Sequence, residues 1–217
     1  MKAYLVYGSP NCRKVLATIQ HLQLDVEIEY LEFDKGDLMT PEYTALNPNR
    51  KVPVLVDGDF RLWESNAICQ YLACQYGSGE LFSGSPQERA NITRWLFWEM
   101  AHFNLASGTI LMETFFKPLF MGASGDPAKI AEGKERFAIY AQILDDQLAQ
   151  TPFVAGDKLT IADFAVASQS DHWDAGDVPY QPYKNIIQWL ERLNCVESWN
   201  STAQINEKML EAVAEAD

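Results

Sequence analysis

The sequence predicts a small α/β domain followed by an all-helical domain. Three observations support this prediction. Alternating apolar runs typical of strands occur almost only before residue 77, the stretch GSGELFSGSP at residues 77–86 has the composition of a linker, and apolar residues beyond it recur at helical spacing. We therefore expect residues 1–76 to form the α/β domain, residues 77–86 to connect the two, and residues 87–217 to form the helical domain.

The first domain is expected to begin with a strand, a helix and a second strand. Residues 2–7 and 26–30 alternate between apolar and polar side chains, and residues 10–22 between them show helical spacing. This order favours a right-handed parallel unit. Residues 35–47 then form a polar connector with a short helix inside it.

The most informative stretch is residues 47–67. A proline precedes one apolar run, and Asp57-Gly58 signals a tight turn before a second run, so a β-hairpin is expected. Ser65 is then expected to be the N-cap of a helix over residues 65–76. The free N–H groups and positive dipole end of such a helix form an anion site.

The second half of the chain predicts a series of helices. Residues 87 to about 116 read as one long or broken helix rich in aromatic side chains, and a loop is expected over residues 117–127. Further helices are expected over residues 128–149 and 183–193. The stretch TIAD at residues 160–163 has the form of a capping box and starts a helix that we expect to be fully buried.

Composition excludes several classes of function. The formal net charge is -13 and no cluster of lysine and arginine occurs, which argues against a nucleic-acid partner. No uninterrupted apolar stretch is long enough to span a bilayer, and the N-terminus shows no signal-peptide pattern, so we expect a cytoplasmic protein without a membrane partner. The three histidines are scattered and the four cysteines fit neither a redox nor a zinc motif, so no metal is expected.

Four local features, taken together, resemble the soluble glutathione S-transferases of the cytosolic type. They are Ser9-Pro10-Asn11-Cys12-Arg13 after the first strand, Asn47-Pro48 through Lys51-Val52-Pro53 before the third, Glu64-Ser65 at the start of the third helix, and Thr160-Ile161-Ala162-Asp163 in the helical half. Their order extends the resemblance to about Leu193. It implies a thioredoxin-like domain followed by a helical domain, and within the family the chain is similar to serine-type, theta-like bacterial members.

The resemblance implies an enzyme that adds glutathione, its co-substrate, to small hydrophobic electrophiles in detoxification. A group after the first strand would activate the glutathione thiol, since the thiolate is the nucleophile. Ser9 is the first candidate, with a purely capping role as its alternative. Asn11 and Cys12 remain open, Cys12 either through a mixed disulfide or simply as a core residue. Tyr4 and Tyr7 are expected within the first strand, which argues against a tyrosine-type mechanism.

The resemblance also implies where glutathione binds. A cis bond between Val52 and Pro53 would present the Val52 backbone to the tripeptide as an added strand. Glu64 and Ser65 would hold the γ-glutamyl group, and Lys51 the glycine carboxylate. The simpler alternatives are a trans proline at a strand edge, a helix cap for Ser65, and solvated charges for Glu64 and Lys51.

The electrophile pocket is expected on the aromatic helix. The candidates are Trp95, Trp98, His102 and Phe103, with Glu99, Phe115 and Phe116 as further ones. The alternative is that aromatic side chains at helical spacing belong to the core.

Two other classes of function stay open at this point. One keeps glutathione but changes the chemistry, to a peroxidase, thiol-disulfide exchange, isomerase or dehalogenase activity. The other is a non-catalytic binding or interaction protein, against which the presence of Ser9, Pro53, Glu64 and Ser65 argues. The resemblance further implies a homodimer, for which exposed apolar residues near Phe60 and Trp63 are candidates.

Overall fold

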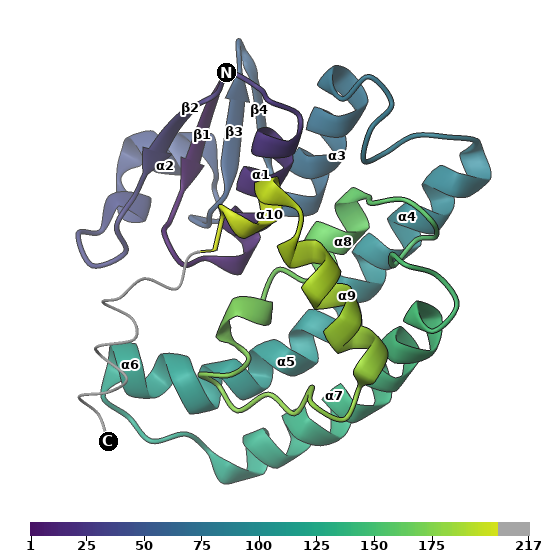
Figure 1. The fold of residues 1–217 in the computed structure, drawn as a ribbon. Coiled ribbons are helices and arrows are strands. Elements are labelled where there is room, and N and C mark those ends of the chain that lie inside the picture. Colours follow the sequence, from purple (N-terminus) through teal and green to yellow (C-terminus); the bar gives the residue numbers. More distant parts are fainter. Residues whose placement is uncertain (204–217) are drawn as a thin grey trace.

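A sheet-containing unit lies against a larger group of helices in the computed structural model, which describes residues 1–203 (Figure 1). The elements of the first unit are β1 (Lys2–Leu5), α1 (Pro10–His21), β2 (Glu27–Tyr30), a 3-10 turn (Asp37–Met39), α2 (Pro41–Leu46), β3 (Val54–Asp57), β4 (Phe60–Trp63) and α3 (Ser65–Tyr76). The expected order of strands and helices is therefore confirmed.

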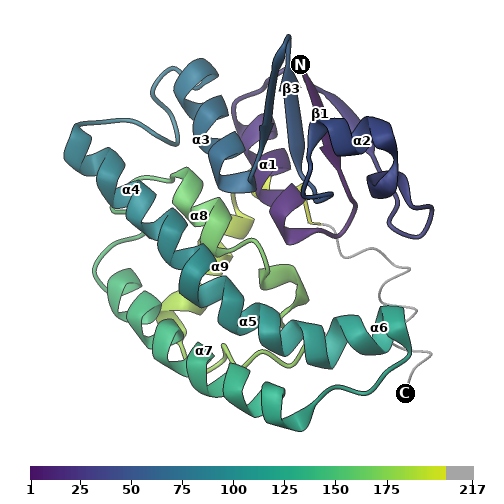
Figure 2. The same cartoon turned by 180° about the vertical axis from the view of Figure 1, so that it is seen from behind.

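All four strands share one sheet in the order β2-β1-β3-β4. β1 runs parallel to β2 and antiparallel to β3, and β3 and β4 form the expected hairpin. Because side chains alternate along a strand, Ala3 and Leu5 pack into the main core with α1 and α3. Tyr4 and Val54 face the opposite side, where they meet Tyr43 of α2. Figure 2 shows α2 on the face of the sheet away from α1.

The helical unit follows α3 after a connection without helices or strands. Its elements are α4 (Pro86–Trp98), a first π-helical segment (Glu99–Phe103), α5 (Asn104–Leu111), a second π-helical segment (Met112–Phe116), α6 (Lys117–Met121), α7 (Pro127–Leu148), α8 (Ile161–Val166), a 3-10 turn (Ser170–His172), α9 (Lys184–Asn194) and α10 (Glu197–Asn200). α8 packs against α1, α3 and α4, and so occupies the junction of the two units (Figures 1 and 2). In residues 1–203, no helix is long and apolar enough to cross a membrane.

Two expectations about local structure are wrong. The stretch expected as a loop over residues 117–127 begins with α6, because the long aromatic helix continues through two π-helical segments to Met121. Ser65 is the first residue of α3 and not its N-cap, a position that Glu64 occupies with a positive φ of 72°. The expected linker over residues 77–86 stays a prediction, and residues 204–217 of the expected helical domain lie outside the described residues.

The capping box at the start of α8 is confirmed. Thr160 caps the helix, and the Asp163 carboxylate accepts hydrogen bonds from the backbone N–H groups of Val154 and Thr160, at 2.8 and 2.9 Å. It also accepts from the Thr160 hydroxyl and from the indole N–H of Trp189 on α9. Burial raises the pKa of Asp163 to about 6, and these four donors oppose the shift. All six residues of α8 are buried, as expected.

Replacing Asp163 by Ala is expected to lower the free energy of unfolding by about 3 kcal/mol or more, because it leaves buried donors without an acceptor. Urea denaturation at pH 7 measures this change. The control is Asp146→Asn on α7, whose exposed carboxylate accepts from Gln142 within the same helix and should change stability by less than about 0.5 kcal/mol. Equal effects of the two substitutions would contradict a structural role for the box.

Candidate active site

The loop after β1 meets the N-terminus of α3. The Ser65 hydroxyl donates a hydrogen bond to the Asn11 side-chain oxygen at 3.3 Å. Tyr4 pairs with Val54 in the antiparallel β1–β3 ladder, so Val52 lies beside Val6, at the start of the same loop. The Val52–Pro53 peptide bond is cis. Residues from three separated stretches of the chain therefore meet at one end of the sheet.

The Ser9 hydroxyl is not used to cap α1. The Ser9 carbonyl accepts from the N–H groups of Cys12 and Arg13, both at 2.9 Å, so the backbone performs the capping role. Within residues 1–203 the Ser9 side chain makes no capping hydrogen bond. The capping alternative therefore explains the Ser9 backbone but not its hydroxyl.

Cys12 belongs to the core of the first unit. Its side chain is fully buried, and its sulfur accepts a hydrogen bond from the Val6 N–H at 3.3 Å. Burial raises the pKa of the Cys12 thiol to about 11, and the Ser9 hydroxyl only partly opposes this. A buried protonated thiol is a poor nucleophile, so the geometry favours the structural alternative for Cys12.

The placement expected for Tyr7 is wrong. β1 ends at Leu5, so Tyr7 lies in the loop two residues before Ser9, and its side chain is exposed. Its ring lies 6.2 Å from that of Tyr30 at the end of β2. Sequence reasoning missed this residue because an alternating run does not reveal where a strand stops.

The N-terminus of α3 is open to an anion. In the described chain, the Glu64 side chain makes no capping hydrogen bond and is exposed, while Ser65 is 6% exposed. The first N–H groups of the helix therefore lack the usual side-chain acceptor. Lys51 lies in the preceding loop, where its carbonyl accepts from the Tyr43 hydroxyl and the Asn47 amide, both at 2.7 Å. The exposed Lys51 ammonium makes no ion pair within residues 1–203.

Comparison with known proteins identifies this arrangement. Family models for the glutathione S-transferase N-terminal and C-terminal domains match residues 4–84 and 109–196. A probable glutathione S-transferase, GSTF2, of Oryza sativa subsp. japonica is 32% identical over 166 residues, which span 76% of this chain and 77% of that protein. The chain belongs to the glutathione S-transferase family. It is a transferase with a thioredoxin-like N-terminal domain and a helical C-terminal domain.

Solved structures agree with this assignment. A theta-class transferase of Xanthomonas axonopodis pv. citri with glutathione bound superposes with a TM-score of 0.86 at 29% identity, covering 94% of this chain and 97% of that one. A delta-class transferase of Nilaparvata lugens has a TM-score of 0.84 at 29% identity, covering 100% of this chain and 99% of that one. Glutathione is therefore supported as the ligand of this transferase.

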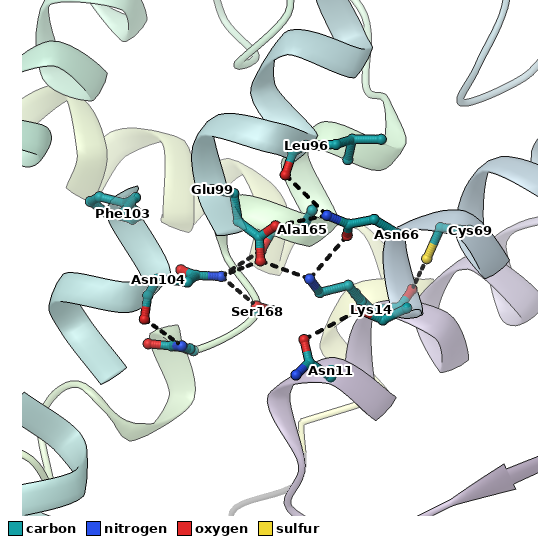
Figure 3. A network of polar contacts seen from close by, with 12 residues as sticks. Asn11, Lys14, Asn66, Cys69, Leu96, Glu99, Phe103, Asn104, Ala165 and Ser168 are labelled. Carbon is teal, nitrogen blue, oxygen red and sulfur yellow. Dashed lines mark hydrogen bonds and ion pairs between the residues drawn. The ribbon is translucent and has the colours of Figure 1, made fainter. Parts of the chain in front are cut away.

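A buried ion pair joins the two domains of the transferase beside this site (Figure 3). Lys14 of α1 is fully buried, and its ammonium lies 2.8 Å from a carboxylate oxygen of Glu99 in the first π-helical segment. The ammonium also donates to the side-chain oxygen of Asn66 at 3.0 Å, and the Asn66 amide donates to the second Glu99 oxygen at 2.9 Å. Asn66 directly follows Ser65, so this network holds the first turn of α3 in place.

The network continues into the helical domain. The Asn104 amide donates to Glu99 at 2.7 Å, to Ser168 at 3.0 Å and to the carbonyl of Ala165. Gln169 donates in turn to the Asn104 carbonyl at 3.0 Å. The sequence gives no local signal for these contacts. Glu99 is expected from the sequence only as a residue of the electrophile pocket, but in the structure it is 2% exposed and belongs to this network.

The aromatic residues expected to form the electrophile pocket do not gather beside Ser9. Phe103 is fully buried and Trp95 is 5% exposed, both within the core. Trp98 stacks on Phe103, and the exposed His102 stacks on Tyr140 of α7, with ring centroids 5.2 and 5.1 Å apart. Trp95 and Trp98 also line a cavity of about 370 Å³ between α4 and α7.

Phe115 and Phe116 are placed differently, on the second π-helical segment. Both rings lie against the ring of His172, at centroid distances of 5.7 and 5.6 Å. His172 directly follows Asp171, whose carboxylate lies 2.8 Å from the guanidinium of Arg13 in the first turn of α1. This segment, rather than the region around Trp95, therefore brings aromatic side chains toward the loop after β1.

Breaking the buried ion pair is expected to destabilise the protein. Lys14→Met or Glu99→Gln should each lower the free energy of unfolding by about 3–5 kcal/mol, because the remaining partner is left buried and unpaired. The double substitution should cost less than the sum of the two. Urea denaturation measures all three, with the exposed pair Lys134–Asp177 as the control, where Lys134→Met should cost less than about 1 kcal/mol. If the double substitution lowers the free energy of unfolding by the sum of the two single effects, Lys14 and Glu99 are not energetically coupled.

The stability of the transferase is expected to fall in mild acid partly through His172. Burial, and then the charge of Arg13, lower the pKa of His172 from 6.5 to about 4, and the Gly8 backbone opposes this. His172 binds a proton more readily in the unfolded chain than in the folded one. The contribution of neutral His172 to the free energy of unfolding is therefore complete above pH 6.5 and is lost as the pH falls toward 4. When the pH is lowered from 7 to 4.5, the free energy of unfolding of the His172→Phe variant should fall by about 2 kcal/mol less than that of the wild type. Identical pH dependences in urea denaturation would contradict this.

Proposed function

We propose that this transferase adds the thiolate of glutathione to small hydrophobic electrophiles, with Ser9 as the group that activates the thiol. The observation that carries this assignment is the Ser9 hydroxyl, which does not cap α1 and lies two residues before Asn11, the residue that Ser65 of α3 contacts. The proposal includes membership of the serine-type, theta-like group, which the likeness to the theta-class structure supports.

The tripeptide lies along residues already near one another. Its γ-glutamyl carboxylate binds at the N-terminus of α3 and Ser65, and its α-ammonium pairs with Glu64. Its cysteine pairs with the Val52 backbone next to Pro53, as an added strand. Lys51, whose ammonium is exposed, pairs with the glycine carboxylate. This order places the cysteine sulfur near the loop that contains Ser9.

The chemistry requires a thiolate near neutral pH. A free cysteine thiol has a pKa of about 8.5, and lowering it by about two units needs roughly 2.7 kcal/mol of differential stabilisation. A hydrogen bond from the Ser9 hydroxyl to the charged sulfur contributes about 1.5–3 kcal/mol. The N-terminal dipole of α1, which begins at Pro10, adds about 0.3–1 kcal/mol. Together these supply the required amount, so no further charged group is needed.

The electrophile binds across from this loop, against the second π-helical segment. Phe116 is half-buried and stacks on the exposed Phe120 of α6, which offers an apolar surface. Trp98 and His102 stay secondary candidates, since their rings pack toward α7. The burial of Cys12 makes thiol-disulfide exchange through that residue a weaker alternative.

The proposed assembly is a cytoplasmic homodimer. Phe60 and Trp63 on β4 are 47% and 39% exposed, and Phe97 on α4 is 69% exposed. Large apolar side chains on a surface are typical of an interface between identical subunits.

The test is glutathione binding by isothermal titration, combined with turnover of a generic aryl halide. The wild type should bind and turn over. Ser9→Ala should lower kcat/KM about ten- to a hundredfold, because one hydrogen bond to the charged sulfur is lost. Ser65→Ala should weaken binding about fivefold or more for the same reason. Cys12→Ala should reduce stability rather than turnover, and Tyr7→Phe should resemble the wild type.

Three outcomes decide the proposal. A wild type that does not bind glutathione would refute it altogether. If Ser9→Ala keeps full turnover while Asn11→Ala loses it, the activating group is the Asn11 amide. If Tyr7→Phe alone loses turnover, the mechanism is of the tyrosine type.

A further inference from the structure

A buried arginine anchors the first turn of α1, which follows Ser9 directly, to the helical domain. Arg13 is 2% exposed although it is charged. Its guanidinium nitrogen Nη1 lies 2.8 Å from a carboxylate oxygen of Asp171, in the 3-10 turn after α8. Nη2 donates to the carbonyl of Trp199 in α10 at 3.3 Å, and the guanidinium lies 3.4 Å from the centre of the Trp199 ring. Two separate elements of the helical domain therefore hold this side chain.

The burial of this guanidinium is costly. Within residues 1–203 neither Nε nor Nη1 of Arg13 has a hydrogen bond of standard geometry, so Nη1 meets Asp171 as an ion pair only. A buried ion pair whose remaining donors are not all satisfied contributes little net stability, but it favours one arrangement of the groups around it. The contact therefore accounts for the placement of α1 better than for the stability of the fold.

The same turn of α1 holds Ser9. The Ser9 carbonyl accepts hydrogen bonds from the backbone N–H groups of Cys12 and Arg13, both at 2.9 Å, so Ser9 moves with this turn. The Cα atoms of an α-helix lie about 2.3 Å from its axis, so a rotation of α1 by about 25° would move Ser9 by about 1 Å. A hydrogen bond lengthened by that amount is largely lost.

Two neighbouring anchors oppose such a rotation. Successive residues of an α-helix point about 100° apart, so Arg13 and Lys14 leave α1 in different directions. Lys14 meets Glu99 and Asn66, whereas Arg13 meets the 3-10 turn after α8 and α10. With only one of these anchors, α1 could pivot about the other.

We propose that Arg13 is a positioning residue, which fixes the first turn of α1 so that the Ser9 hydroxyl reaches the glutathione sulfur. This inference rests on the proposed function. Arg13 takes no part in the chemical step and acts only through the placement of Ser9. The Lys14–Asn66–Glu99 network holds the start of α3 without Arg13. Loss of the Arg13 anchor should therefore raise the pKa of the bound glutathione thiol and leave the γ-glutamyl site intact.

The experiment keeps the charge of Arg13 and removes its geometry. Arg13→Lys retains the cation but loses the planar guanidinium that meets Asp171 and stacks on Trp199. An effect of this variant is therefore an effect of placement and not of charge. Asp171→Asn breaks the same anchor from the other side at nearly unchanged volume, and it serves as the second variant if Arg13→Lys does not fold.

The control repeats this kind of contact away from the site. Arg192 donates to the carbonyl of Pro152 and lies 5.9 Å from the centre of the Phe153 ring, all within the helical domain. Arg192→Lys should match the wild type, while Ser9→Ala marks the shift that follows loss of the hydroxyl itself. The readouts are the ultraviolet absorbance of the bound glutathione thiolate against pH, glutathione affinity by titration calorimetry, and urea denaturation to establish that each variant is folded.

For Arg13→Lys and Asp171→Asn we expect the thiolate midpoint to rise by about one pH unit, which means about tenfold less thiolate below the midpoint. Glutathione affinity at about pH 5.5, where most of the bound thiol is protonated in every variant, should stay within about twofold. The double variant should shift about as much as either single one, because both substitutions break one anchor. A wild-type midpoint in the folded single variants, or an equal shift in Arg192→Lys, would overturn the positioning role.

Two results would instead overturn the proposed function, and this inference with it. One is a wild type that does not bind glutathione, and the other is a Ser9→Ala variant that keeps the wild-type midpoint. If Ser9→Ala shifts the midpoint while folded Arg13→Lys and Asp171→Asn do not, the proposed function stands and only the role of Arg13 is wrong.

Discussion

The buried Lys14–Glu99 ion pair is the contact on which the arrangement of this transferase most depends. Removing two charges from water is costly, and attraction in the interior repays the cost only when the geometry is good and the remaining polar atoms are satisfied. Asn66 forms hydrogen bonds with both Lys14 and Glu99, and Asn104 donates a further one to Glu99, so the polar atoms of the pair have partners. The pair therefore has one arrangement with low free energy, and that arrangement fixes α1, α3 and the first π-helical segment relative to one another.

The same network positions the candidate site, because residues of the site are close to the network in the sequence. Ser65 precedes Asn66 in the sequence, and Asn11 lies one turn before Lys14 on α1.

The two π-helical segments add to this arrangement. π-helical turns interrupt an α-helix frequently at functional sites. Here the first carries the buried Glu99, and the second carries the two phenylalanines that face His172. The helical domain thus holds α1 through separate contacts with Lys14 and Arg13.

Much of the fold and part of the site are predictable from the sequence, for physical reasons that differ between elements. The hairpin around Gly58 and the capping box of Thr160 and Asp163 depend on turn and cap chemistry within a few residues. The pocket residues are a different case. Helical spacing shows which aromatic side chains share a face, but each π-helical segment shifts the register, so a pattern read from Trp95 does not extend to Phe116. The exposed position of Tyr7 depended on where β1 stops, which alternation alone does not show.

The sequence by itself determined the order of strands and helices, the position at which α3 begins and the family, because each is encoded in neighbouring residues. Only the tertiary structure decided what the charged and polar side chains of α1 do. Lys14 finds Glu99 85 residues further along the chain, and Arg13 finds Asp171 in the turn after α8. Such pairs form when the chain folds back on itself, and burial then sets the state of each group. For that reason Cys12 is a core thiol, and His172 lies against Phe115 and Phe116.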